Sequence, residues 1–163
     1  MSDVQDACSA GQYLSFQLAG SACAVPIRSV REIRIWEALT AIPQAPHWLR
    51  GVLNLRGSVV PVMDLRAHME LGAVEVGRAT VILIVEHAEH LLGLLVDAVS
   101  DVEDITCEQI SSASEAAGAL AAGTVCGIAL LDERVLMLLD VAVLVVAVDE
   151  RLIGTSVSCA AAA

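Results

Sequence analysis

Short apolar runs, each bounded by a turn signal, follow one another along the chain and constrain its fold more than any other feature. The clearest runs are Tyr13–Leu18, Cys23–Ile27, Gly51–Leu55, Ser58–Met63, Thr80–Val85, Leu91–Val96, Val99–Ile105, Thr124–Leu131 and Val135–Leu139. Runs of this length that end at Gly, Pro or charged residues predict β-strands. Because they do not alternate with helices, βαβ units are excluded, and we predict an all-β fold, either a sandwich or small barrels.

Four other segments show different patterns. The segment DLRAHMEL, Asp64–Leu71, predicts a short helix with Asp64 as its N-cap. A second helix is predicted from residue 140 to about residue 151. The Ser-, Ala- and Gly-rich segment Ser111–Gly123 has no strand periodicity and predicts a long loop. For Val30–Ile35 a strand and a helix both stay open, because its alternation fits a strand and its spacing to the residues that follow fits a helix.

Composition limits both the interior and the possible partners. Aromatic residues make up 2% of the chain, so Val, Leu, Ile and Ala must fill the core. The formal net charge is −11 and all 9 basic residues are arginine, which argues against nucleic acid as a partner and against an anionic membrane surface. The longest uncharged stretch, Ala7–Ile27, contains Gln, Ser, Gly and Pro, so no membrane insertion is predicted. We therefore expect a cytoplasmic protein.

The stretch GVLNLRGSVVPVMDLR, Gly51–Arg66, places an arginine at the turn of a predicted hairpin. Gly57 supplies the positive φ that many tight turns require, so Arg56 is expected to project from the hairpin corner. An arginine at a turn has little to do inside the fold, which favours a contact with a partner. Arg66, by contrast, is expected to form a local structural pair with Asp64.

The sequence contains no recognised catalytic motif. It has no dinucleotide-binding fingerprint, phosphate-binding loop, zinc-protease motif or serine-hydrolase motif, so we predict no catalytic residue, no cofactor and no metal. Asp97, Asp101 and Glu103 would share one face of a strand, where paired carboxylates could do acid–base chemistry. No nucleophile is linked to them in the sequence, and an acidic outward face explains them better.

One alternative from a different class stays open. The turn EHAEH, Glu86–His90, holds two histidines and two acids. In an extended turn, His87, His90 and the neighbouring acids would collect one divalent ion, as in a small metal-dependent enzyme or sensor. A solvated hairpin tip explains the same residues.

Several longer blocks occur in a characteristic order and spacing. They are YLSFQLAG, AVPIRSVREI, IPQAPHWLRGVLNLRGSVVPVMDLR, LLGLLVDAVSDV and GIALLDERVLMLLDVAVL. On these blocks the chain resembles the CheW-like domain family, the coupling or adaptor proteins of bacterial chemotaxis. The resemblance runs from about Gln12 to Val148, which is nearly the whole chain.

The resemblance implies a fold. Members of the family have two small SH3-like five-stranded β-barrels that share a hydrophobic core, with short helices and a C-terminal helix. It implies a single domain over residues 12–148, in which one barrel takes about residues 24–78. The other barrel would take about residues 80–139 together with the N-terminal strand 13–18. Residues 1–11 and 152–163 would be flexible tails.

The resemblance also implies a function and its residues. The protein would be a non-catalytic adaptor that joins the cytoplasmic tips of methyl-accepting chemotaxis receptors to the regulatory domain of the histidine kinase CheA. It would act in receptor arrays at the inner face of the membrane. The receptor tip is a helical hairpin, and its contact positions map here to Val30, Glu32, Gly51, Arg56, Gly57 and Val99. Structural roles stay open for four of these, since the glycines would permit tight backbone geometry and the valines would lie in the core.

Overall fold

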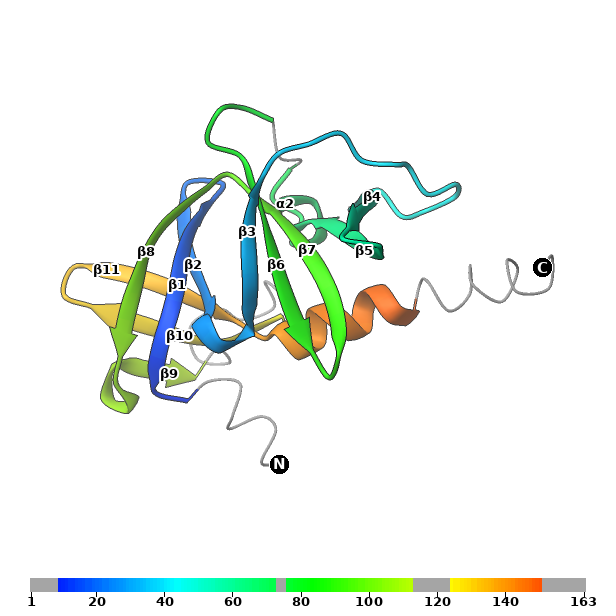
Figure 1. The fold of residues 1–163 in the computed structure, drawn as a ribbon. Coiled ribbons are helices and arrows are strands. Elements are labelled where there is room, and N and C mark those ends of the chain that lie inside the picture. Colours follow the sequence, from blue (N-terminus) through cyan, green and yellow to red (C-terminus); the bar gives the residue numbers. More distant parts are fainter. Residues whose placement is uncertain (1–8, 73–75, 113–123, 151–163) are drawn as a thin grey trace.

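Two β-sheets make up most of the computed structural model, which describes residues 9–72, 76–112 and 124–150 (Figure 1). The six-stranded sheet has the order β8-β1-β2-β11-β10-β9, with β1 (Gly11–Leu18), β2 (Ser21–Pro26), β8 (Ala98–Ile105), β9 (Ile110–Ser112), β10 (Val125–Leu131) and β11 (Arg134–Leu139). The five-stranded sheet has the order β3-β6-β7-β5-β4, with β3 (Val30–Ile35), β4 (Leu49–Leu55), β5 (Ser58–Asp64), β6 (Val81–His87) and β7 (His90–Val96).

The helices are short, and they complete a mostly β fold, as predicted. They are the 3-10 helices η1 (Ile27–Ser29) and η2 (Cys107–Gln109), the helix α2 (Leu65–His68) and a C-terminal helix over residues 141–150. None of the helices in the described ranges has the length and apolar character needed to span a bilayer. Two predictions, the terminal tails and most of the loop up to Gly123, fall largely outside the described residues.

Two-residue turns close three of the hairpins. The turns Ala19-Gly20, Arg56-Gly57 and Ala88-Glu89 each have positive φ at both residues. This is the type I′ geometry, whose twist matches the twist of the paired strands. The turn predicted at Arg56-Gly57 is therefore confirmed, with Leu55 opposite Ser58.

The segment Val30–Ile35, for which the sequence allowed either a strand or a helix, is a strand. It forms the edge of the five-stranded sheet and pairs antiparallel with β6. Its side chains alternate between half-buried and exposed along the whole strand. Pairing with β6, about 50 residues away in sequence, therefore decided between strand and helix.

The strands are divided between the sheets differently from the expected division at about residue 80. β6 and β7 join the sheet of β3, β4 and β5, because β5 pairs in parallel with β7. β2 stays beside β1, and a second parallel contact joins it to β11. Each sheet thus contains one parallel strand pair between segments that are distant in sequence. Local turn signals do not predict such pairs.

The two sheets share an apolar core. Its largest cluster takes Phe16 and Val25 from the six-stranded sheet, Leu83 and Leu94 from the five-stranded sheet, and Leu144 from the C-terminal helix. Each sheet also has a smaller cluster of its own. The shared core places the two sheets against each other in one packed unit, as the family resemblance implied.

The C-terminal helix is capped and buries one of its faces. The Asp140 carboxylate accepts hydrogen bonds from the backbone N–H groups of Ala142 at 3.0 Å and Val143 at 3.4 Å, which satisfies donors that the first turn leaves free. Its buried side chains have the spacing of one helix face; they are Val141, Leu144, Val145 and Val148. In Figure 1 this helix runs beneath the β6–β7 hairpin.

Asp64 joins three elements at the end of β5. Its carboxylate is fully buried and accepts from the Ala67 backbone N–H at 3.1 Å, so the predicted N-cap of α2 is confirmed. The same carboxylate pairs with the Arg50 guanidinium at 3.0 Å. Its backbone N–H donates to the Trp48 carbonyl at 2.7 Å. Arg50 therefore has a structural role beside the hairpin.

We expect Asp64→Ala to lower the free energy of unfolding by about 2–4 kcal/mol, because α2 loses its cap and Arg50 its charged partner. Urea denaturation followed by circular dichroism measures this. Arg134→Ala is the control, since it breaks an exposed pair with Glu103 and should cost less than about 1 kcal/mol. Equal losses for the two variants would contradict the role given to Asp64.

Candidate functional site

An open hollow lies where β3 faces the tip of the β4–β5 hairpin. It has a volume of about 540 Å³ and is lined by Val30, Arg31, Glu32, Leu55, Arg56, Ser58 and Leu91. Three of the six predicted contact residues, Val30, Glu32 and Arg56, therefore lie together. The remaining three do not line the hollow.

The curl of the five-stranded sheet creates this arrangement. β3 and β4 are the first and last strands in the sheet order, yet Glu32 on β3 reaches Arg56 in the turn after β4. The two ends of the sheet therefore approach each other, as in a small barrel. The smaller apolar cluster of this sheet fills the inside of the curl; its members include Leu53, Val62 and Ile84.

Arg56 is held by Glu32 and remains accessible. Its Nη2 lies 2.5 Å from Glu32 Oε2, and 73% of its side chain is exposed. The expectation that an arginine at the turn has little to do inside the fold was wrong, because this ion pair orients the guanidinium. The backbone of Arg56 adopts a left-handed conformation with φ of 51°, as its place in the type I′ turn requires.

Glu32 belongs to a row of alternating charges. Its second carboxylate oxygen is 3.2 Å from Arg34, and Arg34 is 3.4 Å from Glu37. The hydrogen bond from Arg56 lowers the pKa of Glu32 below its ordinary value, burial opposes this shift, and Arg34 adds to the lowering. Glu32 is therefore ionised at neutral pH and keeps both guanidinium groups in place.

The two glycines have backbone explanations. Gly51 has φ of 152°, and a Cβ there would lie 2.5 Å from the carbonyl oxygen of Thr40. Thr40 and Val52 bond to each other beside it, with N–O distances of 3.0 and 2.8 Å. Gly57 has φ of 91° and open space around it, and its N–H donates to Asn54 at 2.8 Å. Both residues shape the strand pair that carries Arg56.

The two valines occupy different sheets. Val30 lines the hollow and also packs against the shared core. Val99 lies on β8 of the other sheet, opposite Phe16, and is partly buried against the same core. The core explanation considered for both valines therefore holds, and Val30 serves the hollow as well.

Sequence reasoning missed four lining residues, and two of them carried a usable signal. Leu55 and Ser58 flank the turn at Arg56-Gly57 and pair directly, so the turn prediction itself places them beside Arg56. Arg31 and Leu91 enter through the pairing of β3, β6 and β7, which local patterns do not specify.

The metal-site alternative finds no support in the geometry. Glu86 pairs with Arg31 at 3.3 Å, and His90 Nδ1 lies 3.3 Å from Asp149. His87 and His90 face each other across the hairpin. Across the residues that the structure describes, no three His, Cys, Asp or Glu side chains gather as a metal would need.

The acidic residues near β8 pair with arginines. Asp97 contacts Arg66 at 3.4 Å, and Glu103 contacts Arg134. The expected local pair of Asp64 and Arg66 was wrong, because Asp64 contacts Arg50 and Arg66 contacts Asp97. Arg50 and Asp64 come together through the β4–β5 hairpin, whereas Arg66 and Asp97 come together where the two sheets meet.

The fold is thus two packed sheets with an open, arginine-rimmed hollow at one end of the five-stranded sheet. Residues 12–149 match the family model described as CheW-like domain. The chain is 37% identical over 130 residues to the chemotaxis protein CheW of Klebsiella aerogenes, covering 80% of this chain and 78% of that protein. It is 36% identical over 129 residues to the probable chemotaxis protein CheW of Rhizobium etli, covering 79% and 83%.

A solved structure has the same fold. The crystal structure of the scaffolding protein CheW from Thermoanaerobacter tengcongensis superimposes with a TM-score of 0.74 at 29% identity, covering 80% of this chain and 88% of that one. The chain belongs to the CheW-like domain family, and it is a non-catalytic scaffold protein of the chemotaxis type.

Alanine at the two glycines should have unequal effects. Gly57→Ala is expected to cost about 1–2 kcal/mol of unfolding free energy, because only the positive φ opposes it. Gly51→Ala is expected to cost about 2–5 kcal/mol, because its Cβ also collides with the Thr40 carbonyl. Thermal and urea unfolding of the two variants would measure the difference. A Gly51→Ala protein as stable as Gly57→Ala would show that the close approach is not a constraint.

The Glu32 carboxyl should titrate according to its arginine partners. Because its pKa is lowered in the folded protein, the ion pair stabilises the fold above the pKa of unfolded glutamate, and this contribution is lost as the pH falls through the folded pKa. Arg56→Gln should move the pKa of Glu32 upward, with Arg34 keeping part of the lowering. Carboxyl ¹³C NMR titration measures the pKa of Glu32 in the native protein and in the variant. An unchanged midpoint in Arg56→Gln would refute the pairing.

Proposed function

We propose that this protein couples the cytoplasmic tips of methyl-accepting chemotaxis receptors to the histidine kinase CheA. The observation that carries the proposal is the exposed Arg56, held by Glu32 at the rim of the hollow. These two residues occupy positions that the family resemblance assigns to receptor contact. The cytoplasm beside receptor arrays would be the place of action.

The lining of the hollow suits one face of a helical hairpin. Val30 and Leu91 are half-buried and supply apolar contact area to the side chains of a helix, and the buried Leu55 forms the base beside them. Arg31 and Arg56 add two positive charges to a protein whose net charge is −11. A helix that presents apolar residues beside a carboxylate would match both properties.

Arg56 can bind a receptor group without leaving Glu32. A guanidinium has five N–H donors in a fixed plane, and one carboxylate uses only some of them. Because most of the Arg56 side chain is exposed, the remaining donors face solvent. A receptor carboxylate or backbone carbonyl would accept from these donors while Glu32 keeps the guanidinium oriented.

The other predicted positions act through the shape of the site. Gly51 and Gly57 set the backbone of the hairpin that presents Arg56, and Val99 would contribute a contact from the six-stranded sheet. We propose residues 12–148 as the functional unit. The kinase would bind at a surface away from this hollow, so that one adaptor holds both partners.

Arg56→Glu should weaken the binding of a receptor-tip fragment by about 1–3 kcal/mol, because the variant removes the donors and places a carboxylate opposite Glu32. Isothermal titration calorimetry with a soluble receptor-tip fragment measures the loss. The fold should survive, because glutamate and arginine meet the same backbone strain at φ of 51°.

The matched control is Arg134→Glu. Arg134 follows the β10–β11 turn, is 54% exposed and pairs with Glu103, so the substitution changes charge and exposed surface equally in the other sheet. It should leave receptor binding unchanged. If both variants lose affinity to the same degree, net charge and not the hollow governs binding.

A further inference from the structure

Asp97 is a one-residue link between the two sheets, and the other passage from sheet to sheet in the described residues runs through η1 (Ile27–Ser29). Asp97 lies between β7 of the five-stranded sheet and β8 of the six-stranded sheet. Because the link is so short, β7 and β8 can change their relative angle only by rotation about the backbone near Asp97. The contacts of Asp97 therefore bear on the angle between the sheets.

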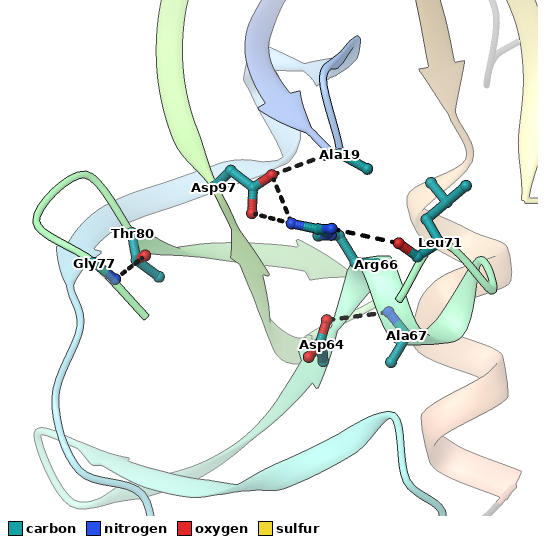
Figure 2. Close-up of polar contacts among 8 residues, drawn as sticks. All are labelled: Ala19, Asp64, Arg66, Ala67, Leu71, Gly77, Thr80 and Asp97. Carbon is teal, nitrogen blue, oxygen red and sulfur yellow. Dashed lines mark hydrogen bonds and ion pairs between the residues drawn. The ribbon is translucent and has the colours of Figure 1, made fainter. Parts of the chain in front are cut away.

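Asp97 is bonded to the six-stranded sheet through both backbone and side chain. Its backbone N–H donates to the Gln17 carbonyl at 3.1 Å. Its Oδ2 accepts from the backbone N–H of Ala19 at 2.8 Å, in the turn between β1 and β2. Figure 2 shows this bond between the Asp97 carboxylate and Ala19.

Arg66 attaches the same carboxylate to the five-stranded sheet. It lies on α2, directly after β5, and its Nη1 is 3.5 Å from Oδ1 and 3.4 Å from Oδ2 of Asp97. Its Nη2 donates to the Leu71 carbonyl at 3.5 Å, which fixes the guanidinium on the helix side (Figure 2). α2 is itself held by the Asp64 cap.

The Arg66–Asp97 pair is partly buried. The side chains of Arg66 and Asp97 are 25% and 26% exposed. The Arg66 Nε atom is buried and has no hydrogen-bond partner in the part of the chain that the structure describes. An arginine with an unmet buried donor is a poor source of stability, and groups of this kind are better explained by the arrangement that they specify.

The shared core needs such a device. Apolar packing is not directional, so it favours contact between the sheets without choosing one angle. The charge-assisted bonds of Asp97 are directional and reach both sheets at their junction. Val99, a proposed receptor contact, lies two residues after Asp97 on β8, whereas the hollow belongs to the other sheet.

We infer that Arg66 and Asp97 are positioning residues that fix the angle between the two sheets and so hold Val99 in place relative to the Arg56 hollow. Only the expected effect on receptor binding rests on the proposed function. The fixed angle itself is a property of the isolated protein.

Residual dipolar couplings of backbone amides in the full chain test the angle. In the native protein, one alignment tensor should fit the amides of both sheets. In Arg66→Gln and Asp97→Ala, each sheet should keep its own good fit while the joint fit fails, because the sheets then vary in relative angle. The separate fits show that the variants are folded. Arg66→Lys, which retains the charge but not the fork, provides a further variant with an intermediate effect.

The matched control is Asp101→Asn, which removes an exposed acid from β8 and should leave the joint fit intact. A joint fit as good in Arg66→Gln and Asp97→Ala as in the native protein would overturn the inference. Binding of a receptor-tip fragment should fall about tenfold in Arg66→Gln. Unchanged binding in a variant with loosened sheets would refute the link to Val99. If the native protein binds no receptor tip, the proposed function is refuted instead. The dipolar couplings would still show whether Arg66 and Asp97 fix the angle between the sheets.

Discussion

The apolar core between the two sheets takes side chains from both of them and from the C-terminal helix. Neither sheet closes off its inner face alone, so each depends on the other for burial. With one Tyr and one Phe in the chain, both fully or almost fully buried, aliphatic side chains do nearly all of this packing. Such a core supplies cohesion but little direction, and the orientation of the parts must come from polar contacts.

The arginines supply these directional contacts. Arg50 fixes the start of α2 through Asp64, Arg66 bridges the sheets through Asp97, and Arg56 closes the curl of the five-stranded sheet through Glu32. Each of these three guanidinium groups pairs with a carboxylate near a junction between elements. Arg56 differs from the other two in its exposure of 73%, which leaves it available to a partner.

Local patterns in the sequence predicted most of the strands, the Arg56-Gly57 turn, the Asp64 cap and the C-terminal helix, because each depends on residues close together in the chain. They left β3 open and placed Ser111 and Ser112 of β9 in a loop. They did not predict the parallel pairs β5–β7 and β2–β11. The strands are therefore distributed between the two sheets differently from the expected division at about residue 80. The same limit applies to the site. Glu32 and Arg56 were both predicted, but their ion pair depends on the curl of the sheet, and the partner of Arg66 depends on the junction between sheets.

The proposed coupling role makes this protein a bridge between receptor and kinase, so the most direct test measures recruitment of the kinase. Membranes that carry receptor cytoplasmic domains would be mixed with CheA, with and without the purified protein, and sedimented. The account predicts that CheA enters the pellet in quantity only when the protein is present, and that receptor control of CheA autophosphorylation appears with it. CheA that stays in the supernatant, although the protein itself sediments with the receptors, would contradict the account.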